Sequence, residues 1–143
     1  MLVHLMYASR AVPAVDQEEL LAILKQSKAN NTKSGVTGAL CLCGHERIFI
    51  QVLEGGREAV NGLYRRILAD TRHSDAVLLH YEEIDERRFA GWSMGQVNVS
   101  RLNPALLLKY SATARLDPHA MSGSTALALL EELVATASIV GQA

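Results

Sequence analysis

Hydrophobic positions at the start of the chain change from a strand-like run to a helix-like spacing. Residues 2–9 (LVHLMYAS) are mostly apolar and predict a buried first strand. Asp16 is a good N-cap for a helix running to about residue 29, and Asn30-Asn31 is expected to end it. The apolar stripe of this helix consists of Leu20, Leu21, Ile23 and Leu24.

Two alternating segments and a second helical stripe follow. Residues 35–43 and 47–53 alternate on either side of Gly44-His45 and predict a β-hairpin that ends at residues 54–56 (EGG). Residues 76–81 and 94–99 predict two more strands, with a charged turn at residues 82–88 between them. Before these strands, apolar side chains recur at helical spacing as far as about Asp70: Val60, Leu63, Tyr64, Ile67 and Leu68.

This order of elements predicts an α+β fold, a ferredoxin-like βαββαβ sandwich with an added fifth strand and two helices on one face of the sheet. Residues 1–100 would form this domain. Residues 101–143 would form a C-terminal helical extension, with a short helix from Pro104 to Tyr110 and a longer one over residues 123–140. The longer helix is expected to cover the sheet rather than form a dimer seam, through Leu127, Leu130, Leu133 and Val134.

Composition and charge narrow the classes of function. The chain has 143 residues, 49% hydrophobic residues and a net charge of −1, which favours a single globular domain and disfavours nucleic acid as a partner. No apolar run reaches the roughly 20 residues needed to cross a bilayer. Cys41 and Cys43 lie on the same side of an alternating segment, so we expect reduced thiols and a cytoplasmic protein.

Motifs for metal binding and phosphate binding are missing from the sequence. The five histidines are scattered, so no metal site is predicted. No phosphate-binding loop occurs. A small enzyme built around Arg72 and His73 stays as a weak alternative, because this fold hosts many chemistries.

Three polar side chains fall where a core should be apolar. Tyr7 ends the first strand, Gln51 interrupts an apolar strand, and Asn31 ends the helix expected to pack over both. A buried amide or phenol without a partner costs about 1 to 3 kcal/mol. These groups should therefore bond to one another, as a satisfied core network, or to a buried ligand.

Six short motifs follow one another along the predicted elements. They are Tyr7-Ala8-Ser9, Asn30-Asn31, residues 35–40 (GVTGAL), residues 49–55 (FIQVLEG), residues 70–73 (DTRH) and residues 89–94 (FAGWSM). In order and at compatible spacing, these motifs resemble those of the BLUF family, the sensors of blue light using FAD, in its short single-domain form. The resemblance runs from Leu2 to about Val99, and its most specific part is Phe-x-Gln-x-Leu-Glu-Gly followed by Trp-x-Met.

The resemblance implies a photoreceptor, not an enzyme, with a flavin held between the two helices above the sheet. The flavin would be FAD, with FMN or riboflavin as alternatives. Ile23 and Ile67 would sandwich its ring, while Asn31 and Arg72 would bond to its carbonyl groups. The other pocket residues would be Ser27, Asn30, Phe49, Gln51, Asp70 and His73.

The resemblance also implies a switch made of Tyr7, Gln51 and the flavin. Under light, an electron and a proton would leave Tyr7 through Gln51 and return, leaving the amide rotated or tautomerised and the absorption shifted to the red. Trp92 and Met94 resemble residues that lie near Gln51 and couple the flavin to the sheet. Simple core packing is the alternative, above all for Trp92, whose side chain could equally lie outward. The signal would then pass through the fifth strand and the C-terminal helices to an unidentified signalling protein or to a second copy in a homodimer. A light-insensitive flavin- or ligand-binding regulatory module is the alternative.

Overall fold

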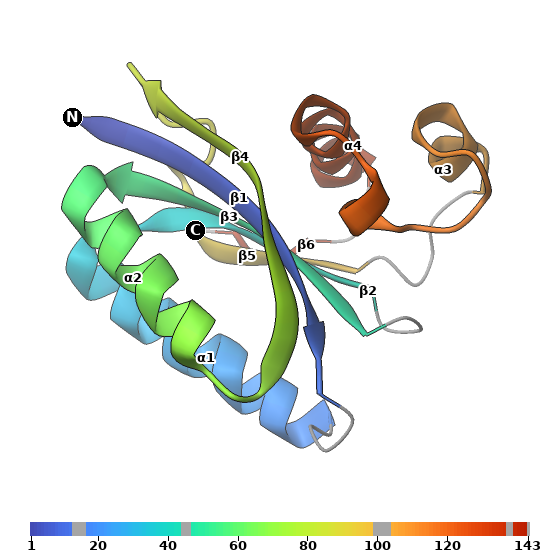
Figure 1. Ribbon diagram of the computed structural model, residues 1–143. Helices are drawn as coiled ribbons and strands as arrows, with labels where there is room; N and C mark the ends of the chain where they lie inside the picture. The colour runs from blue at the N-terminus through green and yellow to red at the C-terminus, as the bar shows by residue number, and fades with distance from the viewer. Residues whose placement is uncertain (13–16, 44–46, 99–103, 137–138, 143) are drawn as a thin grey trace.

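The computed structural model describes residues 1–12, 17–43, 47–98, 104–136 and 139–142. They form one mixed sheet with helices on both faces (Figure 1). The strands are β1 (Leu2–Ala11), β2 (Thr37–Cys43), β3 (Ile48–Gly56), β4 (His73–Ile84), β5 (Trp92–Asn98) and β6 (Ile139–Gln142). The helices are α1 (Gln17–Ser34), α2 (Arg57–Ala69), α3 (Pro104–Tyr110) and α4 (Gly123–Thr136), with a 3-10 turn, η1, at Pro118–Ala120.

The sheet has the strand order β4-β1-β3-β2-β5-β6. Its first four strands are antiparallel neighbours, and β5 joins the edge parallel to β2. This is the ferredoxin-like sandwich with an added fifth strand that the sequence predicts. Helices α1 and α2 cover one face, which we call the α1/α2 face, and α3 and α4 lie over the other, the α4 face (Figure 1). None of the described helices is both long enough and apolar enough to cross a bilayer.

Strand alternation divides the apolar residues between two cores. On β1, Leu5 and Tyr7 pack in the core of the α1/α2 face, whereas Met6 and Ala8 pack in the core of the α4 face. The β3 strand divides in the same way. Strands covered on both faces read as nearly continuous apolar runs, as β1 does.

Helix α1 is longer than the sequence predicts. Asn30 and Asn31 do not end it, and the helix continues to Ser34. Gly35 then takes a left-handed conformation with φ of 73°, and the backbone N–H of Val36 donates to Asn31 O at 3.0 Å. The predicted N-cap, Asp16, lies outside the described residues.

The sequence predicts a purely helical C-terminal extension, but the structure adds a strand to it. The long helix ends at Thr136, and Ile139–Gln142 pairs antiparallel with β5 as a sixth strand. Ile139 and Val140 are β-branched, which suits a strand, and the free edge of β5 supplies backbone partners that an isolated sequence does not reveal. The expectation that α4 covers the sheet is confirmed by the burial of Leu127, Leu130 and Leu133 in the core of the α4 face.

Gly123 sets how closely α4 approaches the sheet. A Cβ atom at Gly123 would lie 1.9 Å from the backbone oxygen of Leu79 on β4, so alanine there must push the helix away. We expect Gly123→Ala to lower the free energy of unfolding by about 1 to 3 kcal/mol, measured by urea denaturation. Gly62→Ala is the matched control, because its Cβ would meet open space on α2. It should raise stability by about 0.5 to 1 kcal/mol, and equal effects of the two changes would contradict this account of α4 docking.

Candidate functional site

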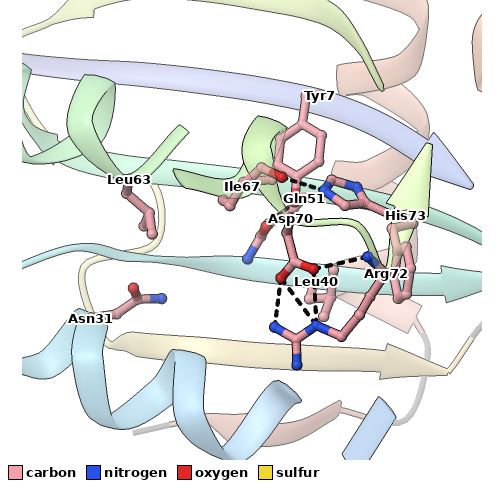
Figure 2. Close-up of a pocket in the computed structure, with 10 residues that line it drawn as sticks. Tyr7, Asn31, Leu40, Gln51, Leu63, Ile67, Asp70, Arg72 and His73 are labelled. Carbon is pink, nitrogen blue, oxygen red and sulfur yellow. Dashed lines mark hydrogen bonds and ion pairs between the residues drawn. The ribbon is translucent and has the colours of Figure 1, made fainter. Parts of the chain in front are cut away.

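A cavity opens between the sheet and the α1/α2 layer (Figure 2). It holds about 630 Å³ of empty space, a volume that includes the space open to solvent at its mouth. Its walls combine apolar side chains with a few polar ones. The lining residues are Tyr7, Asn31, Leu40, Phe49, Gln51, Leu63, Ile67, Asp70, Arg72 and His73.

The cavity brings together most, but not all, of the residues that the sequence singles out. Asn30 is exposed on α1 and does not line it. Ile23 and Ser27 also belong to α1, but their side chains lie outside the described part of the chain. Leu40 and Leu63 also line the cavity, although neither is predicted from the sequence as a site residue. Leu63 could have been found, because it lies one helical turn before Ile67 on the same stripe.

Tyr7 and Gln51 form a buried hydrogen-bonded pair at the floor of the cavity. They are directly opposite each other in the β1–β3 register and are 4% and 5% exposed. The Tyr7 hydroxyl donates to Gln51 Oε1, and Gln51 Nε2 donates to Met94 Sδ at 3.2 Å. The amide is therefore held between a strong partner on one side and a weak sulfur acceptor on the other.

Trp92 and Met94 of β5 lie on opposite faces of the sheet. The resemblance implies that both lie near Gln51, with core packing as the alternative for Trp92. Met94 reaches Gln51, whereas Trp92 packs in the core of the α4 face. The cause is a bulge at Met94, whose φ is 71° and which adds one residue to β5 against β2. The Trp92 ring meets Phe89 edge-on at 5.5 Å and lies against Gly95, where a Cβ would be 2.4 Å from the indole.

Asn31 extends from α1 toward the cavity with an unsatisfied amide (Figure 2). The residue is 1% exposed, and neither Oδ1 nor Nδ2 has a hydrogen-bond partner among the described residues. Leaving such a group buried costs about 1 to 3 kcal/mol. A side-chain amide offers one acceptor and two donors, so it complements a ligand edge with a carbonyl next to an N–H. A flavin has such an edge, and the residues present fit it.

The far wall of the cavity is polar and charged. Arg72 Nε and Nη2 contact Asp70 at 2.9 and 2.5 Å, and the backbone N–H of Arg72 adds a third bond at 2.9 Å (Figure 2). These hydrogen bonds from Arg72 hold the pKa of the Asp70 carboxyl below its usual value. The ring Nε2 of His73 is hydrogen-bonded to the backbone oxygen of Ile67. This wall offers N–H donors close to the apolar stripe of α2.

The Tyr7 hydroxyl keeps its proton well into alkaline solution. Burial raises the pKa of Tyr7 above its ordinary value of 10.0, and the nearby Tyr64 and Asp70 raise it further. The folded protein then binds this proton more tightly than the unfolded chain does. Below about pH 10, ionisation of Tyr7 should therefore contribute no pH dependence to the free energy of unfolding. Above about pH 10, the free energy of unfolding should fall by up to about 1.4 kcal/mol per pH unit, because the unfolded chain loses this proton first.

Urea unfolding between about pH 8 and pH 11 measures this dependence. Tyr7→Phe should make the free energy of unfolding fall less steeply with pH in this range. A smaller dependence on pH should remain from Tyr64, because burial also raises the pKa of Tyr64. Identical slopes for the wild type and Tyr7→Phe would contradict the assignment.

Comparisons with known proteins place the chain in a family. The family model described as "Sensors of blue-light using FAD" matches residues 2–95. The photoactivated adenylate cyclase subunit beta of Euglena longa is 34% identical over 94 residues, which are 65% of this chain and 11% of that protein. The chain therefore spans about a tenth of the length of this curated relative.

Two solved structures are similar over nearly their whole length. "BlsA photo-activated state" has a TM-score of 0.85 at 28% identity and covers 96% of this chain and 99% of its own. "BlrB - a BLUF protein, dark state structure" has a TM-score of 0.77 at 36% identity and covers 94% of this chain and 95% of its own. With the family model spanning more than half of its length, this chain belongs to the BLUF family, the flavin-binding sensors of blue light.

Proposed function

We propose that this chain is a photoreceptor that binds FAD in the cavity, switches through Tyr7 and Gln51, and has no catalytic turnover of its own. The observation that carries the proposal is the hydrogen-bonded series Tyr7, Gln51 and Met94 beside the unsatisfied amide of Asn31. The family is described as sensors of blue light using FAD, which supports FAD as the cofactor. Light-driven function is supported by the likeness to the photoactivated adenylate cyclase subunit beta and to the photo-activated state of BlsA.

The residues around the cavity have separate tasks in binding the flavin. Asn31 would exchange hydrogen bonds with the carbonyl and imide edge, which satisfies its buried amide. Arg72 would donate to the other carbonyl, and Asp70 holds its guanidinium in place. Apolar contact with the ring would come from Leu40, Phe49, Leu63 and Ile67. Burial of this apolar surface favours binding without specifying the nucleotide tail.

A bound flavin supplies blue-light absorption and, once excited, a strong electron acceptor. Tyr7 would donate an electron and, because burial raises the pKa of its hydroxyl and keeps it protonated, also a proton. Gln51 Oε1 accepts the hydrogen bond from the Tyr7 hydroxyl and would therefore lie on the path of that proton. Return of the electron and the proton to Tyr7 would leave the Gln51 amide rotated or tautomerised, with different atoms facing Tyr7 and Met94. The altered hydrogen bonds would shift the absorption to the red until the amide relaxes.

The output would pass from Gln51 through Met94 to β5 and from there to the C-terminal helices. We propose that residues 1–100 form the sensor and residues 101–143 transmit its state, because α4 packs on the sheet face opposite the cavity. The recipient would be a separate signalling protein, with a second copy of this chain as the alternative. Chromatography in darkness and under blue light, with and without candidate partners, distinguishes the two.

An absorption spectrum of the purified protein in the dark and immediately after blue illumination tests the proposal. A flavin band that shifts to the red and relaxes in darkness is the expected result. Bound flavin without a shift would leave a light-insensitive binding module and overturn the photoreceptor proposal. Chromatography of the released cofactor then distinguishes FAD from FMN and riboflavin.

A further inference from the structure

A second polar pair spans the same two strands as Tyr7 and Gln51. His4 of β1 and Glu54 of β3 are also directly opposite each other in the register. His4 lies three residues before Tyr7, and Glu54 lies three residues after Gln51. Because side chains alternate along a strand, this odd spacing turns His4 and Glu54 to the α4 face. His4 Nδ1 and Glu54 Oε2 are 2.8 Å apart, and both residues are 0% exposed. The flavin site does not include this pair.

The second oxygen of Glu54 binds the loop between β4 and β5 (residues 85–91). Glu54 Oε1 accepts a hydrogen bond from the backbone N–H of Phe89 at 2.8 Å. A buried carboxylate is costly unless its oxygens are satisfied, and removing one partner of such a group is expensive. The carboxylate therefore joins β1, β3 and this loop through two buried bonds.

The same loop leads directly to the residue that touches the switch. The backbone N–H of Trp92 donates to Phe89 O at 3.0 Å, forming the turn from which β5 begins. Two residues later, the bulge at Met94 places its sulfur 3.2 Å from Gln51 Nε2. The hydrogen bond from Glu54 to Phe89 thus holds the base of the segment that brings Met94 to Gln51.

The loop also contacts both helical layers. Arg87 Nη1 donates to the backbone oxygen of Gly35, just after α1, at 2.7 Å. Arg88 Nη1 donates to Glu131 of α4 at 2.6 Å, an exposed ion pair that is worth little to stability. A change in the position of the loop would therefore alter its contacts with the end of α1 and with α4.

We propose that Glu54 is a positioning residue for the switch. Its carboxylate holds the loop at residues 85–91 in place. The held loop keeps Met94 against the Gln51 amide, and it links a change in the position of β5 to the position of α4. This inference rests on the proposed function. It predicts that loss of the carboxylate leaves the flavin site intact but loosens the Met94 contact, so the rotated amide relaxes more easily.

Three variants of the flavin-loaded protein test the proposal. Glu54→Ala removes the acceptor for Phe89 N–H, whereas Glu54→Gln keeps an oxygen in its place. Val52→Ala is the matched control, because Val52 is buried on the same strand and the same face and truncation there leaves the loop bonds alone. The measurements are the rate of dark recovery after blue light and hydrogen exchange of the amides of residues 85–91.

We expect Glu54→Ala to recover about tenfold faster than the wild type and to lose protection at the Phe89 amide. Glu54→Gln and Val52→Ala should both recover within about twofold of the wild-type rate. Wild-type recovery in Glu54→Ala, or an equal acceleration in Val52→Ala, would overturn the inference.

Should Glu54→Ala fail to fold, wild-type hydrogen exchange decides the question. A light-dependent change in protection at the Phe89 amide supports the inference, and identical protection in darkness and light overturns it. Failure of the underlying switch is distinguishable: a normal photocycle in Gln51→Leu would remove the proposed function and this inference together. An abolished shift in Gln51→Leu beside wild-type recovery in Glu54→Ala would overturn the inference alone.

Discussion

Gln51→Leu is expected to abolish the light-induced red shift while leaving the flavin bound. Leucine occupies a similar volume at the floor of the cavity but can neither accept from Tyr7 nor donate to any acceptor. The Tyr7 hydroxyl then loses its partner, at a cost of about 1 to 3 kcal/mol of stability. Difference spectra recorded before and after illumination give the amplitude of the shift, and retained yellow colour shows that binding survives.

Two companion variants sharpen this test. Tyr7→Phe should also lose the shift, because it removes the donor while leaving the amide in place. Phe49→Leu changes an apolar wall of the same cavity and leaves the pair untouched, so it should keep a reversible shift. A normal photocycle in Gln51→Leu or in Tyr7→Phe would show that the switch lies elsewhere.

The surroundings of Gln51 explain why its amide could have two orientations. In one, Oε1 faces the Tyr7 hydroxyl and Nε2 faces the Met94 sulfur at 3.2 Å. Sulfur is a weak acceptor, so turning Nε2 away from it sacrifices little. A buried polar group that lacks a hydrogen-bond partner is costly. The orientation of an amide with one strong partner and one weak partner therefore depends on which donor or acceptor a ligand places beside it.

Asn31→Ala should weaken flavin binding by about a hundredfold, because it removes two hydrogen bonds worth about 1 to 1.5 kcal/mol each. The same change removes a buried, unsatisfied amide from the ligand-free protein and places a better helix former in α1. We therefore expect the ligand-free variant to be more stable than the wild type by about 1 kcal/mol or more. Opposite signs for binding and stability would be the signature of a residue reserved for a ligand.

Asn30→Ala is the natural control for this prediction. Asn30 is the neighbouring asparagine of the same doublet, yet it is exposed on α1 and absent from the cavity wall. Its substitution should leave flavin affinity within about twofold of the wild type. Titration of the ligand-free protein with FAD, followed by the loss of flavin fluorescence, compares the two variants. Equal affinities for Asn31→Ala and the wild type would exclude Asn31 as a flavin ligand.

Much of the fold follows from local signals in the sequence. Period-two alternation and turn residues locate the β2–β3 hairpin, and helical spacing from Val60 to Leu68 locates α2. Element ends are less certain from sequence, because the neighbour that extends a strand is distant along the chain. Strand β4 exceeds its prediction at both ends, since it pairs with β1 from Leu2 to Ala11. For the same reason, the pairing of residues 139–142 with β5 was not foreseen.

Local patterns in the sequence predict which residue types meet in this protein. They are a phenol and an amide on neighbouring strands, asparagines and apolar side chains on the helices that cover them, and an arginine in the turn after α2. Motif order and strand alternation suffice for that, because both are properties of short segments. The three-dimensional packing adds that Asn31 and not Asn30 faces the cavity, that Met94 and not Trp92 meets Gln51, and that Glu54 binds Phe89. These choices depend on a bulge in β5 and on contacts between distant segments, which no local pattern encodes.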